Sequence, residues 1–126
     1  MLIRFLSSKA AIAAAAALIL TDVAIAGSCG GHVCWGAIGV GEDGRTARAS
    51  NFRTAPEALE HARRVCLDKC DRIEVFHSGC GAIVTAGDAV FSGFSTDRNA
   101  AIQEAEDNCA ATGEKSCRLR VWACTN

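Results

Sequence analysis

Eight cysteines constrain the fold of this chain more than any other feature. The chain has 126 residues, and every cysteine lies beyond residue 28. They are Cys29, Cys34, Cys66, Cys70, Cys80, Cys109, Cys117 and Cys124. An even number of cysteines in a short exported chain is typical of a disulfide framework, which stabilises a domain too small to bury a large core. We therefore expect one domain in which all eight cysteines are paired.

The first 26 residues have the pattern of a cleavable signal peptide. Arg4 and Lys9 precede an uninterrupted apolar run over residues 10–20, and residues 24–26 (Ala-Ile-Ala) supply a cleavage site. The apolar run is shorter than the roughly 20 residues that a helix needs to cross a bilayer, so no permanent transmembrane anchor is expected. The pattern predicts a secreted or periplasmic protein. Its mature chain has a Gly- and Cys-rich segment over residues 27–34 and a single domain over residues 35–126.

Residues 26–29 (Ala-Gly-Ser-Cys) offer an alternative, because they resemble a loose lipobox in which Cys29 becomes a lipidated N-terminus. Ala26 is a poor substitute for the leucine that such a motif prefers. Lipidation of Cys29 would also leave an odd number of cysteines and one thiol without a partner. We therefore favour a disulfide between Cys29 and Cys34.

An internal repeat organises the domain. Residues 35–38 (Trp-Gly-Ala-Ile) are echoed by residues 80–83 (Cys-Gly-Ala-Ile), and similar segments follow each tetrad at nearly constant spacing. The matched apolar positions are Ala58, Leu59, Ala62 and Cys66 in the first half, and Ala101, Ile102, Ala105 and Cys109 in the second. Self-similarity of this kind indicates a duplication. We interpret the domain as two related units, residues 35–79 and 80–124.

Each unit is predicted to run strand, strand, helix, strand. In the first, residues 35–40 and 45–51 form strands, and Thr54 opens a helix through a capping box with Pro56 in its first turn. The expected buried stripe of this helix is Leu59, Ala62, Val65 and Cys66. The second helix is capped by Ser95, Thr96 or Asp97, is buried through Ile102, Ala105 and Cys109, and stops at Gly113.

The closing strands, residues 70–76 and 117–122, alternate apolar and charged side chains. Ile73, Val75, Leu119 and Val121 are the apolar members. Alternation with period two predicts one buried face and one solvated face. We therefore expect an α+β fold: an antiparallel sheet with the two helices on one face, stapled by disulfides.

Several motifs in order resemble the bacterial family called domain of unknown function 4189. They are the tetrad at residues 35–38, Ser50-Asn51, Cys80-Gly81-Ala82, the helix-end Cys66 and Cys109, and the closing Trp122-Ala123-Cys124. The resemblance covers roughly residues 35–124. It implies a small exported protein with a cysteine framework and supplies no catalytic residues. This chain departs from the family in having no tyrosine and in carrying the additional pair Cys29 and Cys34.

Eight cysteines allow 105 pairing patterns, and the internal repeat reduces the number of patterns to consider. Cysteines at each helix end and at the next strand start are near in sequence, so Cys66 is expected to pair with Cys70, and Cys109 with Cys117. Cys80 then bridges to Cys124 and ties the units together, and Cys29 pairs with Cys34. The main alternative pattern links each helix to the end of the strand that follows it, through Cys66–Cys80 and Cys109–Cys124. Cys70 then pairs with Cys117 across the two units.

Two motifs carry possible ligand chemistry, and for both we favour a structural interpretation. Residues 39–44 fit GxGxxG, but no helical pattern follows the last glycine, so a hairpin turn is expected in place of a nucleotide site. Cys66, Cys70, His77 and Cys80 have zinc-like spacing. The second unit has no equivalent histidine, and export favours disulfides, so we expect no metal and no cofactor.

Catalytic residues are not identifiable from the pattern. Cys80 and His77 could form a nucleophilic pair, but no third residue stands out to orient them. His32 and His61 have no partner in the pattern. Glu104, Glu106 and Asp107 lie on the second helix, where charge normally faces solvent. The aromatic residues Trp35, Phe76, Phe91, Phe94 and Trp122 are expected in the core.

We therefore expect a noncatalytic module that binds a protein or an envelope component, as an inhibitor, immunity factor or effector does. The alternative is a small periplasmic or secreted hydrolase. Nucleic acid is not an expected partner, because the formal net charge is −1 and basic residues alternate with acidic ones. An enzyme should have a pocket that joins His77 to a carboxylate or thiol, whereas a binding module should expose apolar side chains.

The signal-peptide assignment predicts that the mature protein begins at Gly27. Intact mass measured on the secreted or periplasmic product checks this. A product that begins at a diacylated Cys29, or one that retains Met1, would contradict the assignment.

Overall fold

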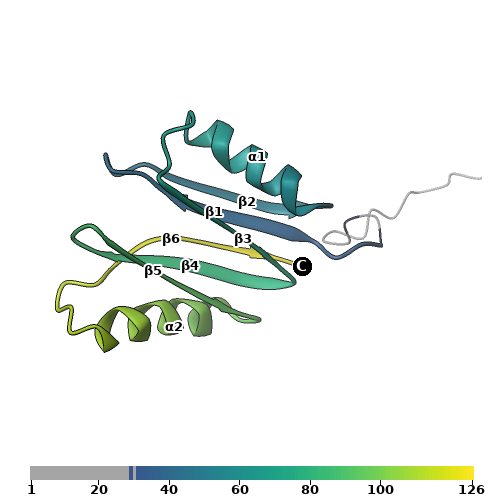
Figure 1. Ribbon diagram of the computed structural model, residues 1–126. Helices are drawn as coiled ribbons and strands as arrows, with labels where there is room; N and C mark the ends of the chain where they lie inside the picture. The colour runs from purple at the N-terminus through teal and green to yellow at the C-terminus, as the bar shows by residue number, and fades with distance from the viewer. Residues whose placement is uncertain (1–28, 30) are drawn as a thin grey trace, which may run out of the picture.

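The computed structural model describes Cys29 and residues 31–126 (Figure 1). The expected signal peptide, residues 1–26, lies outside the described residues. The elements are β1 (Trp35–Val40), β2 (Thr46–Phe52), α1 (Ala55–Val65), β3 (Arg72–His77), β4 (Gly79–Ala86), β5 (Ala89–Ser95), α2 (Arg98–Ala111) and β6 (Arg118–Thr125). Each half of the chain thus runs strand, strand, helix, strand, as the sequence predicts.

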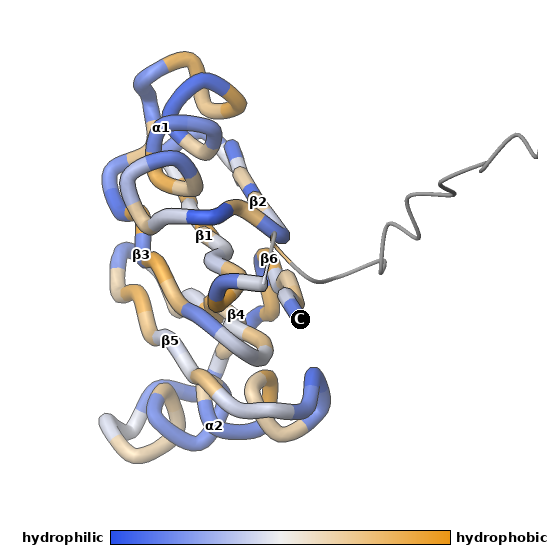
Figure 2. Tube along the Cα trace, turned by 90° about the vertical axis from the view of Figure 1, so that its right-hand side faces the viewer, coloured by the Kyte–Doolittle hydropathy of each residue, from blue (hydrophilic) through white to orange (hydrophobic). Residues whose placement is uncertain are grey.

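The strands form two antiparallel three-stranded sheets, in the orders β2-β1-β3 and β5-β4-β6. The first strand of each half is therefore the central strand of its sheet. Figure 1 shows the sheets face to face, with α1 outside the first sheet and α2 outside the second. The side view in Figure 2 likewise places the helices at opposite ends of the molecule with the strands between them.

The α+β class is confirmed, but the expected arrangement of one sheet with both helices on one face is wrong. Each half folds its own helix onto its own sheet. The opposite face of that sheet is also apolar at its centre, and it can leave water only by meeting the other sheet. The layers are therefore helix, sheet, sheet and helix.

Three apolar clusters fill the spaces between these layers. Small side chains pack α1 on the first sheet (Ala37, Ala47, Ala49, Ala58, Ala62 and Cys66). A matching set packs α2 on the second sheet (Cys80, Ala82, Val84, Ala86, Ala101, Ala105 and Cys109). Larger side chains lie between the two sheets (Ile38, Val40, Phe76, Ile83, Val121 and Ala123). Alanine on both partners lets each helix approach its sheet closely.

The closing strands do not have one buried and one solvated face. In β3, Phe76 is buried between the sheets on the face that also carries Arg72 and Glu74, while Val75 is 38% exposed. In β3 the prediction fails because the face assigned to solvent meets the other sheet. In β6, Val121 is buried between the sheets as expected, but Leu119 is 41% exposed.

Local signals place both helices correctly. The Thr54 Oγ1 accepts a hydrogen bond from the Glu57 N–H at 3.3 Å, and the Asp97 carboxylate accepts one from the Ala100 N–H at 3.0 Å. The second helix ends at Ala111, two residues before Gly113, whose φ is +85°. Val65 is an exception to the expected stripe, because it is 47% exposed at the last position of α1.

The four disulfides join the pairs that the repeat favours. Cα–Cα distances are 5.3 Å for Cys29–Cys34, 5.5 Å for Cys66–Cys70, 4.0 Å for Cys80–Cys124 and 6.2 Å for Cys109–Cys117. One expected consequence is wrong. Cys80 and Cys124 face each other on β4 and β6 of the second sheet, so their bridge does not tie the two units. Both cysteines belong to the second unit, residues 80–124.

A hydrogen-bonded clip joins the two sheets where β2 and β6 end. The Asn51 N–H donates to Thr125 Oγ1 at 3.1 Å, and the Thr125 hydroxyl donates to Asn51 Oδ1 at 3.0 Å. The Asn126 N–H adds a bond to the same Oδ1 at 3.2 Å. Asn51 has a φ of +62°, a left-handed conformation that asparagine tolerates better than most residues. Thr125 is buried, so these bonds satisfy a hydroxyl that water does not reach.

The disulfide pairing predicts the result of nonreducing peptide mapping. Digestion of the oxidised protein should release a peptide pair linking Cys66 to Cys70 and another linking Cys109 to Cys117. A peptide linking Cys66 to Cys80 would instead support the rival pattern.

The clip predicts that Thr125→Val destabilises the protein by about 1–3 kcal/mol, because valine keeps the shape and leaves the Asn51 amide without its partner. Chemical denaturation measures the free energy of unfolding. The matched control is Thr96→Val, at an exposed position, which should change it by less than about 0.5 kcal/mol. Equal effects of the two substitutions would contradict this role of the clip.

Candidate binding groove

His77 lies at the end of β3 and contacts the Trp35 ring edge-on, with 4.9 Å between ring centroids. Around it is a shallow cavity of about 400 Å³, lined by His32, Val33, Trp35, Arg53 and His77. Of the described residues, those that line this cavity include no carboxylate and no thiol. The structure therefore does not join His77 to the partners that the hydrolase alternative requires.

The structure also separates the other candidates taken from the sequence. All eight cysteines are in disulfides, so Cys80 carries no thiol for a pair with His77. Cys66 and Cys70 share one bridge, and β3 separates Cys70 from His77 by roughly 20 Å at about 3.3 Å per residue. The described residues contain no group of three metal-ligating side chains.

The remaining histidine and carboxylate candidates lie on helix surfaces. His61 on α1 packs against Phe52, with ring centroids 5.0 Å apart. Glu104, Glu106 and Asp107 are exposed on α2, and Asp107 accepts a hydrogen bond from the Gln103 amide at 2.8 Å. Residues 39–44 run from the end of β1 into the turn before β2, and no helix follows them.

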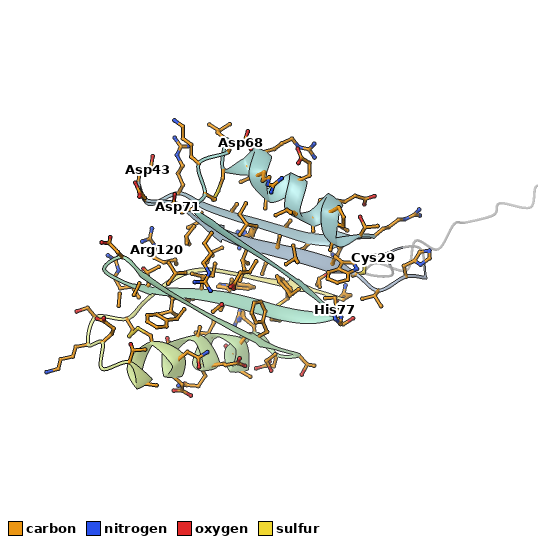
Figure 3. All side chains as sticks on the ribbon, viewed as in Figure 1. Cys29, Asp43, Asp68, Asp71, His77 and Arg120 are labelled. Atoms are coloured by element: carbon orange, nitrogen blue, oxygen red, sulfur yellow. A yellow bond between two sulfur atoms is a disulfide. The ribbon has the colours of Figure 1, made fainter. Side chains whose placement is uncertain are left out.

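A polar cavity of about 530 Å³ opens at the other end of the sandwich. Figure 3 shows this division: His77 and Cys29 lie at one end, and Asp43, Asp71 and Arg120 at the other. The cavity lining is Val40, Gly41, Glu42, Asp71, Arg72, Thr85, Gly87, Asp88, Val90 and Arg120. Its charges are mixed, with more carboxylates than guanidinium groups.

Two ion pairs form near this end. The Arg72 Nη2 lies 2.8 Å from Glu74 Oε1, and its Nη1 donates to the Val90 carbonyl at 3.4 Å. In the turn between β1 and β2, the hydrogen bond from Arg45 lowers the pKa of Asp43. These contacts stabilise a turn and strand ends. The Arg72 guanidinium group therefore already has hydrogen-bond partners within the protein.

A third hollow, the β2–β6 groove, has a different charge balance. Its volume is about 360 Å³, and its lining is Thr46, Ala47, Arg48, Val65, Arg120, Val121 and Trp122. β2 supplies one wall, β6 supplies the other, and the last residue of α1 lies at its rim. No carboxylate of the described residues belongs to the lining.

A β-bulge places Arg120 in this groove. Ile83 of β4 lies opposite Val121, and the next residue, Val84, lies opposite Leu119, so Arg120 is the extra residue in β6. A bulge redirects a side chain that regular alternation would send elsewhere. The Arg120 Nη2 consequently reaches the turn of the first sheet, 3.6 Å from the position that a Cβ on Gly44 would occupy.

Two arginines lie near the Trp122 ring. The guanidinium carbon of Arg98, the first residue of α2, is 4.8 Å from the Trp122 ring centroid, and that of Arg48 on β2 is 6.0 Å away. These distances are within the range of cation–π attraction. Trp122 is partly buried and packs against the core beneath α2, so the expectation that it is a core residue holds in part.

The arginines near Trp122 form no ion pair within the described residues, although Arg120 also lines the polar cavity that contains Glu42, Asp71 and Asp88. The described part of the chain forms ion pairs between Arg45 and Asp43 and between Arg72 and Glu74. Arg48, Arg98 and Arg120 belong to neither pair. Among the described residues, the lining of the groove therefore has two guanidinium groups and no carboxylate, on a chain whose formal net charge is −1.

The groove was not predicted from the sequence, because the alternation of basic and acidic residues along the chain gave no sign that arginines would gather at one place. Arg48 alternates with the buried Ala47 and Ala49, as in any half-buried strand, so its neighbours in sequence give no sign of Trp122. The bulge at Arg120 depends on the pairing of β6 with β4, which has no local signature.

Comparisons with known proteins place the chain among relatives of unknown role. A comparison with curated proteins finds no match. Among solved structures, the chain is similar to Rv1813c from Mycobacterium tuberculosis, determined by NMR, with 25% sequence identity and a TM-score of 0.59. That similarity covers 99% of this chain and 96% of the other. The family described as "Domain of unknown function (DUF4189)" matches residues 35–124, as the sequence motifs indicate, and the chain belongs to that family.

Proposed function

We propose that this protein is an exported, noncatalytic module that binds a protein or an envelope component through the β2–β6 groove. The observation that carries the proposal is the set of three arginines without ion pairs around Trp122. Guanidinium groups and a tryptophan face are the side chains that binding sites use most, because they combine directed hydrogen bonds with a large contact area.

The disulfide framework supports export and a rigid surface. Disulfides persist in oxidising compartments outside the cytoplasm, and this chain has four of them. No helix in the described part of the chain combines the length and apolar character needed to cross a membrane. A cross-linked domain loses little conformational entropy on binding, so its groove can act as a preformed site.

The apolar rim of the groove also favours binding. Val65 is 47% exposed beside it, although valine is normally buried. The hydrolase alternative has less support, since the His77 cavity offers Arg53 and His32 in place of a carboxylate or thiol. We therefore favour the binding module over the hydrolase.

The proposal predicts that retention of a partner depends on the groove arginines. Mature wild-type protein, immobilised and incubated with envelope and culture fractions, should retain a component that the double variant Arg48→Glu, Arg120→Glu loses. Reversing two charges in the groove repels an anionic partner and should reduce retention at least about tenfold, or roughly 1.4 kcal/mol.

The matched control is Arg53→Glu with Arg63→Glu, which makes the same charge change at exposed positions outside the groove. It should retain the component as wild type does. Equal loss in both variants would indicate nonspecific charge attraction and would overturn the assignment to the groove.

A further inference from the structure

We propose that the β2–β6 groove recognises a phosphate monoester group. This inference rests on the proposed function, since it names the chemistry of what that groove binds. It concerns Arg48 and Arg120 in the lining, Arg98 above the Trp122 ring, and the Thr46 hydroxyl.

Charge is the first argument. Two guanidinium groups line the groove and a third lies against the Trp122 ring, with no carboxylate of the described residues in the lining. A phosphate monoester carries close to two negative charges at neutral pH and offers several strong acceptor oxygens. Guanidinium groups bind such oxyanions in a bidentate manner, with hydrogen bonds roughly twice as strong as those between neutral groups. A single carboxylate would neutralise less of this charge.

Space is the second argument. The groove lies between β2 and β6, whose far ends are joined by the bonds between Asn51 and Thr125. Its volume of about 360 Å³ is at the small end of the range for small-molecule sites. It therefore suits a compact charged group with part of its carbon skeleton better than an extended acidic peptide.

The walls of the groove are the third argument. Trp122 and Val65 provide apolar surface beside the arginines, against which the carbon skeleton attached to a phosphate could pack. Thr46 adds a hydroxyl that can donate to a phosphate oxygen. The polar cavity at the end of the sandwich shares Arg120 with the groove but is a poorer candidate, because its own lining adds Glu42, Asp71 and Asp88, which would repel a phosphate.

Titration with inorganic phosphate tests the assignment. Oxidised mature protein is followed by ¹H–¹⁵N NMR at constant ionic strength, with chloride replaced by phosphate. The Nε–H signals of Arg48 and Arg120 and the indole N–H of Trp122 should shift along one saturable curve. Arg48→Gln and Arg120→Gln should each raise the dissociation constant at least about tenfold, whereas Arg63→Gln, which removes the same charge outside the groove, should leave it unchanged.

Failure to saturate at millimolar phosphate, or equal weakening by all three substitutions, would overturn the proposal. Unchanged backbone signals far from the groove in each variant would show that the variant is folded. These outcomes are distinct from failure of the proposed function, because the retention contrast between the groove variant and its control does not depend on phosphate.

Vesicles distinguish the two sources of such a group. Phosphatidic acid presents a phosphate monoester on a lipid, and phosphatidylserine vesicles of matched surface charge present a diester and a carboxylate. Preferential, Arg48- and Arg120-dependent binding to phosphatidic acid would assign the group to an envelope lipid. Saturable binding of free phosphate without that preference would assign it to a soluble phosphorylated ligand. Stronger binding to phosphatidylserine would contradict the choice of a monoester.

Discussion

Face-to-face packing of the two sheets is the interaction on which the rest of this structure depends. Each sheet already carries its own helix on one side, and its other side presents large apolar residues such as Ile38 in the first sheet and Ile83 in the second. Full burial of one such side chain contributes about 1.5–3 kcal/mol. Because only the opposite sheet can cover this face, the two halves must associate. Their association brings β2 beside β6 and so creates the groove.

The predictable part of the fold was the part with local signals. The caps at Thr54 and Asp97, the strand at residues 35–40 and the short-range disulfides follow from spacing and residue type. The division into two sheets does not, because alternation predicts that a strand has a covered face without saying what covers it. The charged positions of β3 illustrate this: Glu74 alternates with Ile73 as a solvated residue would, yet its face turns toward the other sheet.

The candidate site was less predictable, because each of its parts depends on contacts distant in sequence. The Asn51 clip joins residues 74 positions apart, and the bulge at Arg120 arises from pairing with β4. Trp122 packs against the core as expected, but its ring also lies near arginines from two other elements. The cysteine pattern pointed instead to Cys80 and His77. Their surroundings have fewer groups that can bind a ligand than those of Trp122.

Native-state hydrogen exchange on an Ile83→Val variant tests the central claim, that the sheets are stable only together. The substitution removes one methylene from the core between them and should cost about 1 kcal/mol. If the sheets form one cooperative unit, the slowest amides of β1 and of β4 should lose protection by the same free energy. Loss of protection confined to the second sheet, with β1 unchanged, would show that the halves are independently stable and would contradict this account.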